Sequence, residues 1–402
     1  MKTERITNDI GRAAGYIRSG GLVAVPTETV YGLAANGLDE SAVQRIYEVK
    51  GRPTVKPLSL MVPDADAIAR YCEDAPAAAY TLASRFWPGP LTIVLRARPL
   101  VPALVRAGGQ TVGLRCPDSE KTLALLRAAE APLAAPSANP SGLPSPKTAE
   151  EVAAYFDGQI EAILDGGPCE LGTESTIVSL DGRGLHVLRH GALPEAAIRR
   201  CLIGSLRIVG VTGGPGCGKS TALESLRDMG ALVIDADAVY HGLLDRGGAM
   251  LDEIGARFPG TVEGGALRRK ALGQVVFSDP QALKALQAIT DRHVEAEIDR
   301  LLSDYAASGG KCAAVDAINV IGTQIERYAA AVVGIVAPTE ARVRRLVARE
   351  GVSEEYARMR IGAQRPNAYF EKHCTHTIAN DGSVEDFRRR CDDLFHKILE
   401  EN

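Results

Sequence analysis

Short apolar runs alternate with segments of helical spacing along the whole chain, which is the pattern of an α/β protein. In the first half, apolar runs predict strands at residues 22–26, 91–95 and 111–117. Apolar positions three and four residues apart predict helices at residues 10–19 and 41–50. Together these segments predict a mixed α/β sheet with helices packed on it.

Single residues mark the ends of these two helices. Gly20-Gly21 is expected to stop the first helix, and Ser41 is expected to cap the second. The second helix runs into Lys50-Gly51-Arg52, with Lys56 four residues further on. These cations suit an anion, but cations are also common at solvated helix ends, and the spacing leaves both interpretations open.

The second half alternates strands and helices in the manner of a parallel sheet flanked by helices. Buried strands are predicted at residues 208–211, 231–237, 312–316 and 332–336, and a further strand is predicted at residues 376–379. The second of these strands is expected to end in two carboxylates, Asp235 and Asp237, which either serve a site at the strand end or cap the next helix. A strongly basic helix is predicted at residues 339–349, where a solvated face is the default interpretation.

A glycine-rich loop, G-G-P-G-C-G-K-S-T at residues 213–221, follows the first strand of the second half. Strand, glycine loop and helix start together form the P-loop pattern. Small residues let backbone N–H groups turn toward phosphate oxygens, and the following helix adds its positive end. Lys219 supplies a mobile cation, and the Ser220 hydroxyl can bind the Mg²⁺ of ATP. The candidate ATP contacts are Gly213, Gly216, Cys217, Gly218, Lys219, Ser220 and Thr221.

A P-loop normally opens a nucleotide-binding domain, yet here it lies at mid-chain. The 402 residues are more than one ordinary core needs, so we expect two domains, 1–203 and 204–402. A formal charge of −4 argues against a global basic field for nucleic acid. The eight scattered cysteines never form C-x-x-C and are expected to be free thiols without disulfide partners. The polar N-terminus and the lack of a long apolar stretch predict a cytoplasmic protein without membrane contact.

Several polar blocks of the first half occur in a fixed order. They are P-T-E-T-V-Y-G-L, K-G-R-P, P-L-S, W-P-G-P-L-T, R-C-P, A-P-S-A-N-P-S-G, E-S-T-I-V and L-R-H-G. Hydroxyls, carboxylates and cations at strand ends are typical of a site in a cleft. Together these blocks resemble the YrdC/Sua5 family, the threonylcarbamoyl-AMP synthases, over about residues 5–200.

The resemblance implies a twisted mixed sheet with a large cleft. It also implies a reaction that joins L-threonine, bicarbonate and ATP into threonylcarbamoyl-adenylate and pyrophosphate. The family's K-x-R and S-x-N signatures match Lys50, Arg52, Ser137 and Asn139, which are expected to line the cleft, with Lys50 and Arg52 as catalytic cations. Other ligand positions of the family fall at or near Thr29, Lys56, Thr111, Arg115, Ser145, Ser175 and Arg189. Mg²⁺ is expected on the triphosphate, and tRNA-modifying transferase proteins are expected to receive the product.

The second half resembles dephospho-CoA kinase over residues 206–400, in blocks that include V-I-D-A-D, V-F-S-D-P, R-L-V-A-R-E-G-V-S and I-A-N-D-G. The family transfers the γ-phosphate of ATP to the 3′-hydroxyl of dephospho-CoA. By match, Asp237 is the candidate general base and Lys219 the catalytic cation, while Arg345 and Arg349 are candidate arginines of a mobile lid.

The acceptor side departs from this family's pattern. Asp291-Arg292-His293 stands where a His-Pro pair is common, and residues 316–322 replace an acid followed by P-L-L-F-E. A kinase for another small hydroxyl compound, or an inactive second half, therefore remains an alternative. For the first half, the alternative is an RNA-binding module, including binding of double-stranded RNA, since the product of the family ends up on tRNA.

Overall fold

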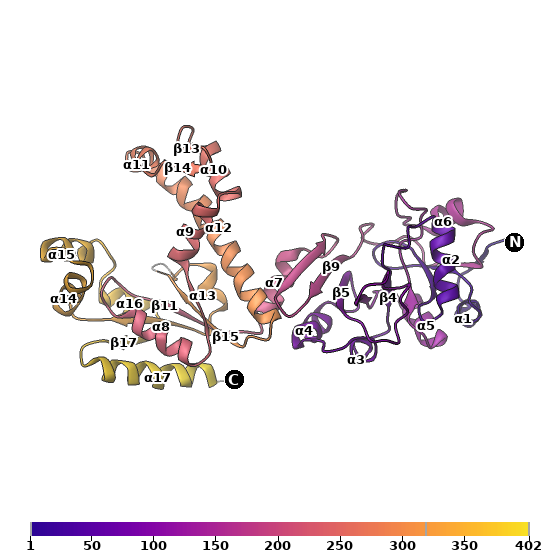
Figure 1. Cartoon of the computed structure of the whole chain (residues 1–402), viewed down its shortest axis with the longest axis horizontal. Helices are drawn as coiled ribbons and strands as arrows, with labels where there is room; N and C mark the ends of the chain where they lie inside the picture. Colours follow the sequence, from indigo (N-terminus) through magenta and orange to yellow (C-terminus); the bar gives the residue numbers. More distant parts are fainter. Residues whose placement is uncertain (1, 318–319, 401–402) are drawn as a thin grey trace. The chain divides into compact units, whose positions relative to one another are not determined.

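The computed structural model describes residues 2–317 and 320–400 (Figure 1). It divides into two compact units, Met1–Leu202 with Ala307–Gly309, and Ile203–Ala306 with Gly310–Asn402. Ile318 and Asn319, which belong to the departing acceptor segment, lie outside the described residues.

A ten-stranded mixed sheet organises the first unit, in the order β1-β8-β2-β3-β7-β4-β6-β5-β9-β10. The strands are β1 (Glu4–Ile6), β2 (Val23–Val25), β3 (Gly32–Asn36), β4 (Ser59–Met61), β5 (Leu91–Arg96), β6 (Thr111–Arg115), β7 (Leu133–Ala134), β8 (Ala162–Leu164), β9 (Thr176–Leu180) and β10 (Leu185–Arg189). The sheet contains parallel pairs, such as β4 with β6, and antiparallel pairs, such as β5 with β6. The predicted mixed sheet is therefore confirmed.

The helices of this unit bury one apolar stripe each. They are α1 (Ile10–Arg18), α2 (Glu40–Lys50), α3 (Asp66–Tyr71), α4 (Ala77–Phe86), α5 (Glu120–Ala129), α6 (Ala149–Phe156) and α7 (Glu195–Ile203). Ile17 of α1 and Leu125 of α5 share one core with strands β2 and β8. The predicted cap of α2 is wrong by two residues, because the carboxylate of Asp39 accepts hydrogen bonds from the N–H groups of Ser41 and Ala42.

The second unit is built on a five-stranded sheet, in the order β12-β15-β11-β16-β17, whose ladders are all parallel. The strands are β11 (Arg207–Thr212), β12 (Leu232–Asp235), β15 (Cys312–Asp316), β16 (Ala331–Val336) and β17 (His376–Ala379). The predicted parallel sheet is confirmed, and its three central strands, β15, β11 and β16, are largely buried. The expectation of a buried strand over residues 231–237 is wrong, because β12 lies at the edge of the sheet and is only partly buried. The strand expected over residues 231–237 ends earlier, at Asp235, and Asp237 belongs to the first turn of the following helix.

Helices cover this sheet and also form a second cluster beside it. The helices are α8 (Lys219–Asp228), α9 (Ala236–Arg246), α10 (Ala249–Arg257), α11 (Arg269–Val276), α12 (Pro280–Ala307), α13 (Gln324–Tyr328), α14 (Thr339–Glu350), α15 (Glu354–Gly362), α16 (Asn367–His373) and α17 (Val384–Glu400). Leu226 of α8 and Phe395 of α17 pack in one core with Val211 of the sheet. Helices α9 to α12 share a separate apolar cluster near a small hairpin, β13 (Val262–Glu263) with β14 (Ala266–Leu267), which lies away from the sheet in Figure 1. Within the described part of the chain, we find no helix that is both long and apolar enough to span a membrane.

Two candidate active sites

Strand ends and loops of the first unit surround a cavity of about 290 Å³. Five of the residues predicted for this site line it: Arg52, Arg115, Ser137, Ser175 and Arg189. They come from segments that are more than 130 residues apart in the chain, so the sheet is what brings them together. The wall therefore carries three guanidinium groups and several hydroxyls.

Other predicted residues of this site lie behind the wall or away from it. Thr29, Lys50, Asn139 and Ser145 are outside the cavity lining but contact residues of the wall or its loops. Lys56 is exposed and does not line the cavity. Thr111 is not brought to it either, because Thr111 begins β6 while Arg115 ends it, and four residues of strand span about 13 Å. Thr111 instead borders a separate groove beside Glu73.

Lys50 is only 3% exposed, and it supports a loop of the cavity rather than facing the cavity. Its ammonium donates hydrogen bonds to the carbonyl oxygens of Ser137, at 2.5 Å, and of Asn139. Burial, together with repulsion from Arg52, lowers the pKa of Lys50 to about 8. The two cations of the K-x-R signature thus occupy different environments, since Arg52 lines the cavity while Lys50 holds the S-x-N loop.

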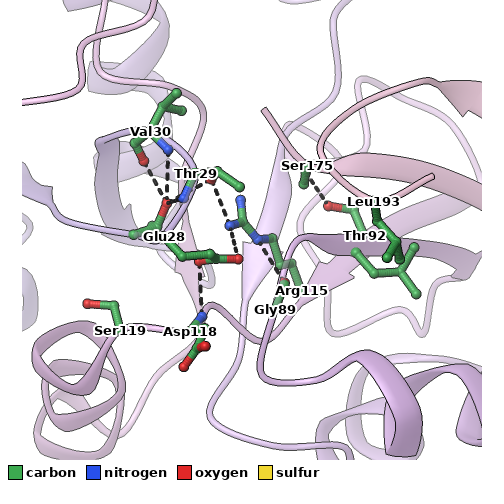
Figure 2. Close-up of polar contacts among 12 residues, drawn as sticks. Glu28, Thr29, Val30, Gly89, Thr92, Arg115, Asp118, Ser119, Ser175 and Leu193 are labelled. Carbon is green, nitrogen blue, oxygen red and sulfur yellow. Dashed lines mark hydrogen bonds and ion pairs between the residues drawn. The ribbon is translucent and has the colours of Figure 1, made fainter. Parts of the chain in front are cut away.

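A buried ion pair lies at the Arg115 end of the wall (Figure 2). Arg115 donates from Nη2 to Oε1 of Glu28 and to Oγ1 of Thr29, both at 2.8 Å. The other carboxylate oxygen of Glu28 accepts from the N–H of Asp118 at 3.0 Å. Sequence reasoning noted the T-E-T block but did not assign its Glu28, because the partners lie almost ninety residues further on.

Glu174 is a second carboxylate that sequence reasoning did not assign, and it lines the cavity. It forms an ion pair with Arg189 and accepts a hydrogen bond from the Ser145 hydroxyl at 2.9 Å. Arg189 also donates to the carbonyl and hydroxyl oxygens of Ser175, at distances from 2.8 to 3.1 Å. A wall with several cations, hydroxyls and a carboxylate can hold phosphates beside a zwitterionic amino acid.

In the second unit, the P-loop borders a larger cavity of about 640 Å³. The predicted residues that line it are Gly216, Cys217, Gly218, Lys219, Ser220, Thr221, Asp237, Arg345 and Arg349. Gly213 is not part of the lining, and its carbonyl oxygen accepts a hydrogen bond from Lys219 at 3.4 Å. The structure thus brings nearly all predicted residues of this site together.

The shape of the P-loop depends on Gly218 and on a residue that sequence reasoning did not assign, Asn380. Gly218 has a φ of 105°, and a Cβ atom there would lie 2.2 Å from Nδ2 of Asn380. That nitrogen donates to the carbonyl oxygen of Cys217 at 2.9 Å, while Oδ1 of Asn380 accepts from Arg345 at 2.8 Å. Asn380 therefore connects the P-loop to the basic helix α14.

Helix α14 turns two of its arginines toward the P-loop, so the solvated-face interpretation is wrong for them. Arg342 is 3% exposed and donates from Nε to the carbonyl oxygen of Pro215 at 2.9 Å, and its burial lowers its pKa. Arg345 contacts Asn380 and the P-loop carbonyls. Arg349 borders the cavity but is exposed and pairs with Glu350. Arg342 was not assigned from the sequence, because helical spacing alone cannot show which face meets the loop.

Three carboxylates face the P-loop lysine across the cavity: Asp235, Asp237 and Asp316. Asp235 caps α9, since its Oδ1 accepts from the N–H groups of Asp237 at 2.9 Å and Ala238 at 3.1 Å. Asp237 has no such capping role and lines the cavity from the first turn of α9. Burial raises the pKa of Asp316, Lys219 opposes this rise, and the two neighbouring carboxylates add to it.

The donor set fits a Mg²⁺ ion that arrives with a nucleotide. Oδ1 of Asp316 is buried without a hydrogen-bond donor, because its 3.4 Å contact with Lys219 is an ion pair that lacks hydrogen-bond geometry. The Ser220 hydroxyl lines the same cavity. Within residues 2–317 and 320–400, no group of three or more histidine, cysteine or acidic side chains is arranged to hold a metal by itself. Mg²⁺ commonly takes one or two protein ligands and completes its shell with phosphates and water, which agrees with this arrangement.

The departing segment at Asp291-Arg292-His293 lies within α12. Arg292 and His293 both contact the carboxylate of Glu253, at 2.5 and 3.0 Å. This ion-pair group links α12 to α10. None of the three departing residues borders the P-loop cavity.

Comparisons with known proteins divide the chain in the same way. Residues 15–191 match the Sua5/YciO/YrdC family model, described as telomere recombination, and residues 207–386 match the dephospho-CoA kinase model. The first half is 49% identical over 196 residues to the threonylcarbamoyl-AMP synthase of Pyrococcus abyssi, which covers 49% of this chain and 57% of that protein. It is 36% identical over 199 residues to a Mycobacterium tuberculosis protein provisionally named threonylcarbamoyl-AMP synthase, covering 50% of this chain and 91% of that protein.

The second half is 37% identical over 182 residues to the dephospho-CoA kinase of Symbiobacterium thermophilum, which covers 45% of this chain and 76% of that protein. The chain spans less than two thirds of the length of the Pyrococcus abyssi synthase, and more than two thirds of the other two relatives. The chain therefore belongs to two families, with the Sua5/YciO/YrdC family in its first half and the dephospho-CoA kinase family in its second half.

Proposed function

We propose that the chain is a bifunctional enzyme with one catalytic domain in residues 1–203 and another in residues 204–402. The first domain forms L-threonylcarbamoyl-adenylate and pyrophosphate from L-threonine, bicarbonate and ATP. The second transfers the γ-phosphate of ATP to the 3′-hydroxyl of dephospho-CoA and releases ADP and CoA. Family membership of each half supports this proposal, and so does the set of charged groups in each cavity.

In the first cavity, the reaction needs positioning and charge stabilisation rather than a covalent nucleophile. The amine of threonine attacks the carbon of bicarbonate and water leaves, which gives a carbamate. An oxygen of this carbamate then attacks the α-phosphorus while pyrophosphate leaves. Negative charge then develops on phosphoryl oxygens, and Arg52, Arg115 and Arg189 are the cations that line this cavity. Lys50 acts on the reaction indirectly, because it does not line the cavity but holds the loop that carries Ser137.

In the second cavity, Lys219 and the P-loop N–H groups hold the outer phosphates of ATP. Bound with ATP, Mg²⁺ neutralises phosphate charge, and Ser220 with Asp316 or Asp237 would hold it on the protein side. Asp237 accepts the proton of the acceptor hydroxyl, since it lines the cavity without serving as a helix cap. Arg345 and Arg349 border the same space and can stabilise the transferring phosphoryl group.

The kinase half of the proposal depends mainly on one observation, the composition of the P-loop cavity. The P-loop, the carboxylates of β12, α9 and β15, and the arginines of α14 meet around a single cavity, as γ-phosphate transfer requires. The departures at residues 291–293 lie outside that cavity, whereas Ala317 of the second departing segment lines it beside Asp316. A kinase for another hydroxyl compound is the second candidate for this half, on account of these departures.

The test measures both products of ATP in one preparation of the full chain with Mg²⁺. Dephospho-CoA-dependent ADP formation that disappears in Lys219→Ala supports the kinase assignment. Pyrophosphate formation that requires both threonine and bicarbonate supports the synthase assignment. Pyrophosphate without ADP would mean a different acceptor or an inactive second half, and ADP without pyrophosphate would overturn the synthase assignment alone.

The same proposal places the enzyme in the cytoplasm, where all eight cysteines, free in the structure, would stay reduced. Its adenylate product would pass to tRNA-modifying transferase proteins. The RNA-binding alternative for the first half is not favoured, because the cleft keeps the cations and hydroxyls that the synthase reaction uses. Binding of double-stranded RNA without threonine-dependent pyrophosphate release would support that alternative instead.

A further inference from the structure

Glu28 is a buried carboxylate that the reaction outlined above does not use. It is 8% exposed and does not line the cavity, and its carboxylate oxygens are engaged by Nη2 of Arg115 and the N–H of Asp118. Figure 2 shows both contacts converging on this one side chain. Because neither oxygen faces the cavity, Glu28 cannot exchange a proton with a substrate held there.

The guanidinium group of its partner Arg115 is held at two of its nitrogens, Nε and Nη2, while Nη1 can still bind a ligand in the cavity. Nη2 of Arg115 donates to Glu28 and to Thr29, and Nε lies 3.4 Å from the carbonyl oxygen of Gly89. Nη1 makes no hydrogen bond to any residue that the structure describes, as Figure 2 shows for the residues drawn there. Arg115 also lines the cavity. A guanidinium group is planar, so holding Nε and Nη2 also sets the direction of Nη1.

We propose that Glu28 is the positioning residue of Arg115, which it orients so that Nη1 meets an anionic oxygen of a substrate. This inference rests on the proposed synthase function of the first unit. A buried ion pair is weak evidence for a stabilising role, because desolvation of both charges offsets much of their attraction. Positioning explains the arrangement better, since the carboxylate fixes an arginine that borders the cavity and spares one of its nitrogens. The anionic oxygen belongs to the carboxylate of threonine or to a phosphate of ATP.

The chain contains a matched control pair in the same unit. Glu161 accepts a hydrogen bond from the N–H of Leu22 at 2.6 Å and pairs with Arg45 at 2.9 Å, so it joins a backbone N–H and an arginine just as Glu28 does. Neither Glu161 nor Arg45 lines the cavity. Glu161→Gln therefore removes a carboxylate from an ion pair of the same unit, although a more exposed one, without touching the orientation of Arg115.

The test compares Glu28→Gln, Glu161→Gln and the unchanged chain in pyrophosphate release, with separate titrations of threonine and ATP. Glu28→Gln is expected to raise the KM for one of the two substrates about tenfold or more, the loss of one well-placed charged hydrogen bond. A rise for threonine identifies its carboxylate as the ligand of Nη1, and a rise for ATP identifies a phosphate. Glu161→Gln should keep both KM values, even if it lowers thermal stability as much.

A double-mutant cycle with Arg115→Lys separates positioning from a general structural effect. If Glu28 acts through Arg115, the double variant is expected to be no worse than Arg115→Lys alone. Independent, additive losses would overturn the proposal, as would unchanged KM values in Glu28→Gln. If Glu28→Gln does not fold, Thr29→Val removes the other acceptor of Nη2 at nearly constant volume, and a higher KM for only one of the two substrates is expected. An unchanged KM in that variant would overturn the proposal too.

A wild-type chain without threonine-dependent pyrophosphate release would overturn the proposed function, whereas an active wild type with an unaffected Glu28→Gln would overturn this inference alone.

Discussion

The Nζ atom of Lys219 lies 3.4 Å from Oδ1 of Asp316, so the P-loop lysine faces the end of the neighbouring strand β15. Asp316 is also the register partner of Asp235 on β12. A phosphate-binding cation and two strand-end carboxylates therefore meet at the carboxyl edge of one parallel sheet, where ligands of open α/β sheets bind. Binding of ATP would give Lys219 a stronger anionic partner than Asp316.

We expect Lys219→Ala to lower the rate of dephospho-CoA-dependent ADP formation by about 10²–10³-fold, the usual effect of losing one charge-stabilising donor. Steady-state ADP assays measure it. Lys311→Ala is the matched control, because Lys311 is exposed and precedes the opposite end of β15. Threonine-dependent pyrophosphate release should stay unchanged in both variants, and a parallel loss of it would indicate misfolding.

The two carboxylates near the start of α9 should behave differently when they are substituted. Asp237→Asn is expected to lower kcat for ADP formation by about 10²-fold or more with an unchanged melting temperature, since Asp237 is the proposed general base. Asp235→Ala is expected to cost about 1 kcal/mol in the free energy of unfolding, because Asp235 caps the helix. Kinetics and denaturant unfolding of both variants test this. Equal kinetic effects would contradict the division of roles.

The sequence predicted the second unit closely, because local patterns determine most of it. The strands Cys312–Asp316 and His376–Ala379 match their apolar runs, and helix α14 follows the predicted basic segment. The P-loop motif places its own residues, since the strand, loop and helix that hold them are contiguous. The contact of Asn380 with Cys217 could not be predicted in this way, because 163 residues separate the two.

The first site was harder to predict, for the same reason. Its residues were found through the family resemblance, but their arrangement depends on pairing between distant strands. Thr111 lies close to Arg115 in the sequence, yet the extended strand carries it away from the cavity. Glu28 could not be assigned without knowing that it pairs with Arg115. Lys50 was expected to line the cleft, and only the fold shows that its acceptors are backbone carbonyls.

Gly218 provides a test of the P-loop shape. Gly218→Ala is expected to abolish measurable kinase activity, because φ is 105° and the new Cβ would lie 2.2 Å from Nδ2 of Asn380. Gly242→Ala in α9 is the control, since a Cβ there meets no atom within 4 Å, and alanine favours the helix by up to about 1 kcal/mol. ADP assays measure the kinase activity of both variants, and melting temperatures measure their stability. A fully active Gly218→Ala would contradict the loop geometry.

The buried ammonium of Lys50 should make both the stability of the first unit and the synthase activity depend on pH in the alkaline range. Burial lowers the pKa of Lys50 from its usual 10.5 to about 8. Below pH 8 the ammonium is charged in both folded and unfolded chains, and its burial penalty is fully present. As the pH rises from about 8 toward 10.5, the folded chain loses this proton before the unfolded chain does, so the contribution of Lys50 to stability becomes more favourable.

The expected effect of the same titration on activity has the opposite sign. A neutral amine holds the carbonyl oxygens of Ser137 and Asn139 less firmly, so pyrophosphate release is expected to fall as the pH rises through about 8. Lys50→Arg cannot lose its charge in this range, so its profile, scaled to its own maximum, should lack this alkaline decline. The kinase activity of each preparation controls for general alkaline inactivation. An identical decline in Lys50→Arg would assign the titration to another group and leave the ammonium of Lys50 without a measurable role in the synthase reaction.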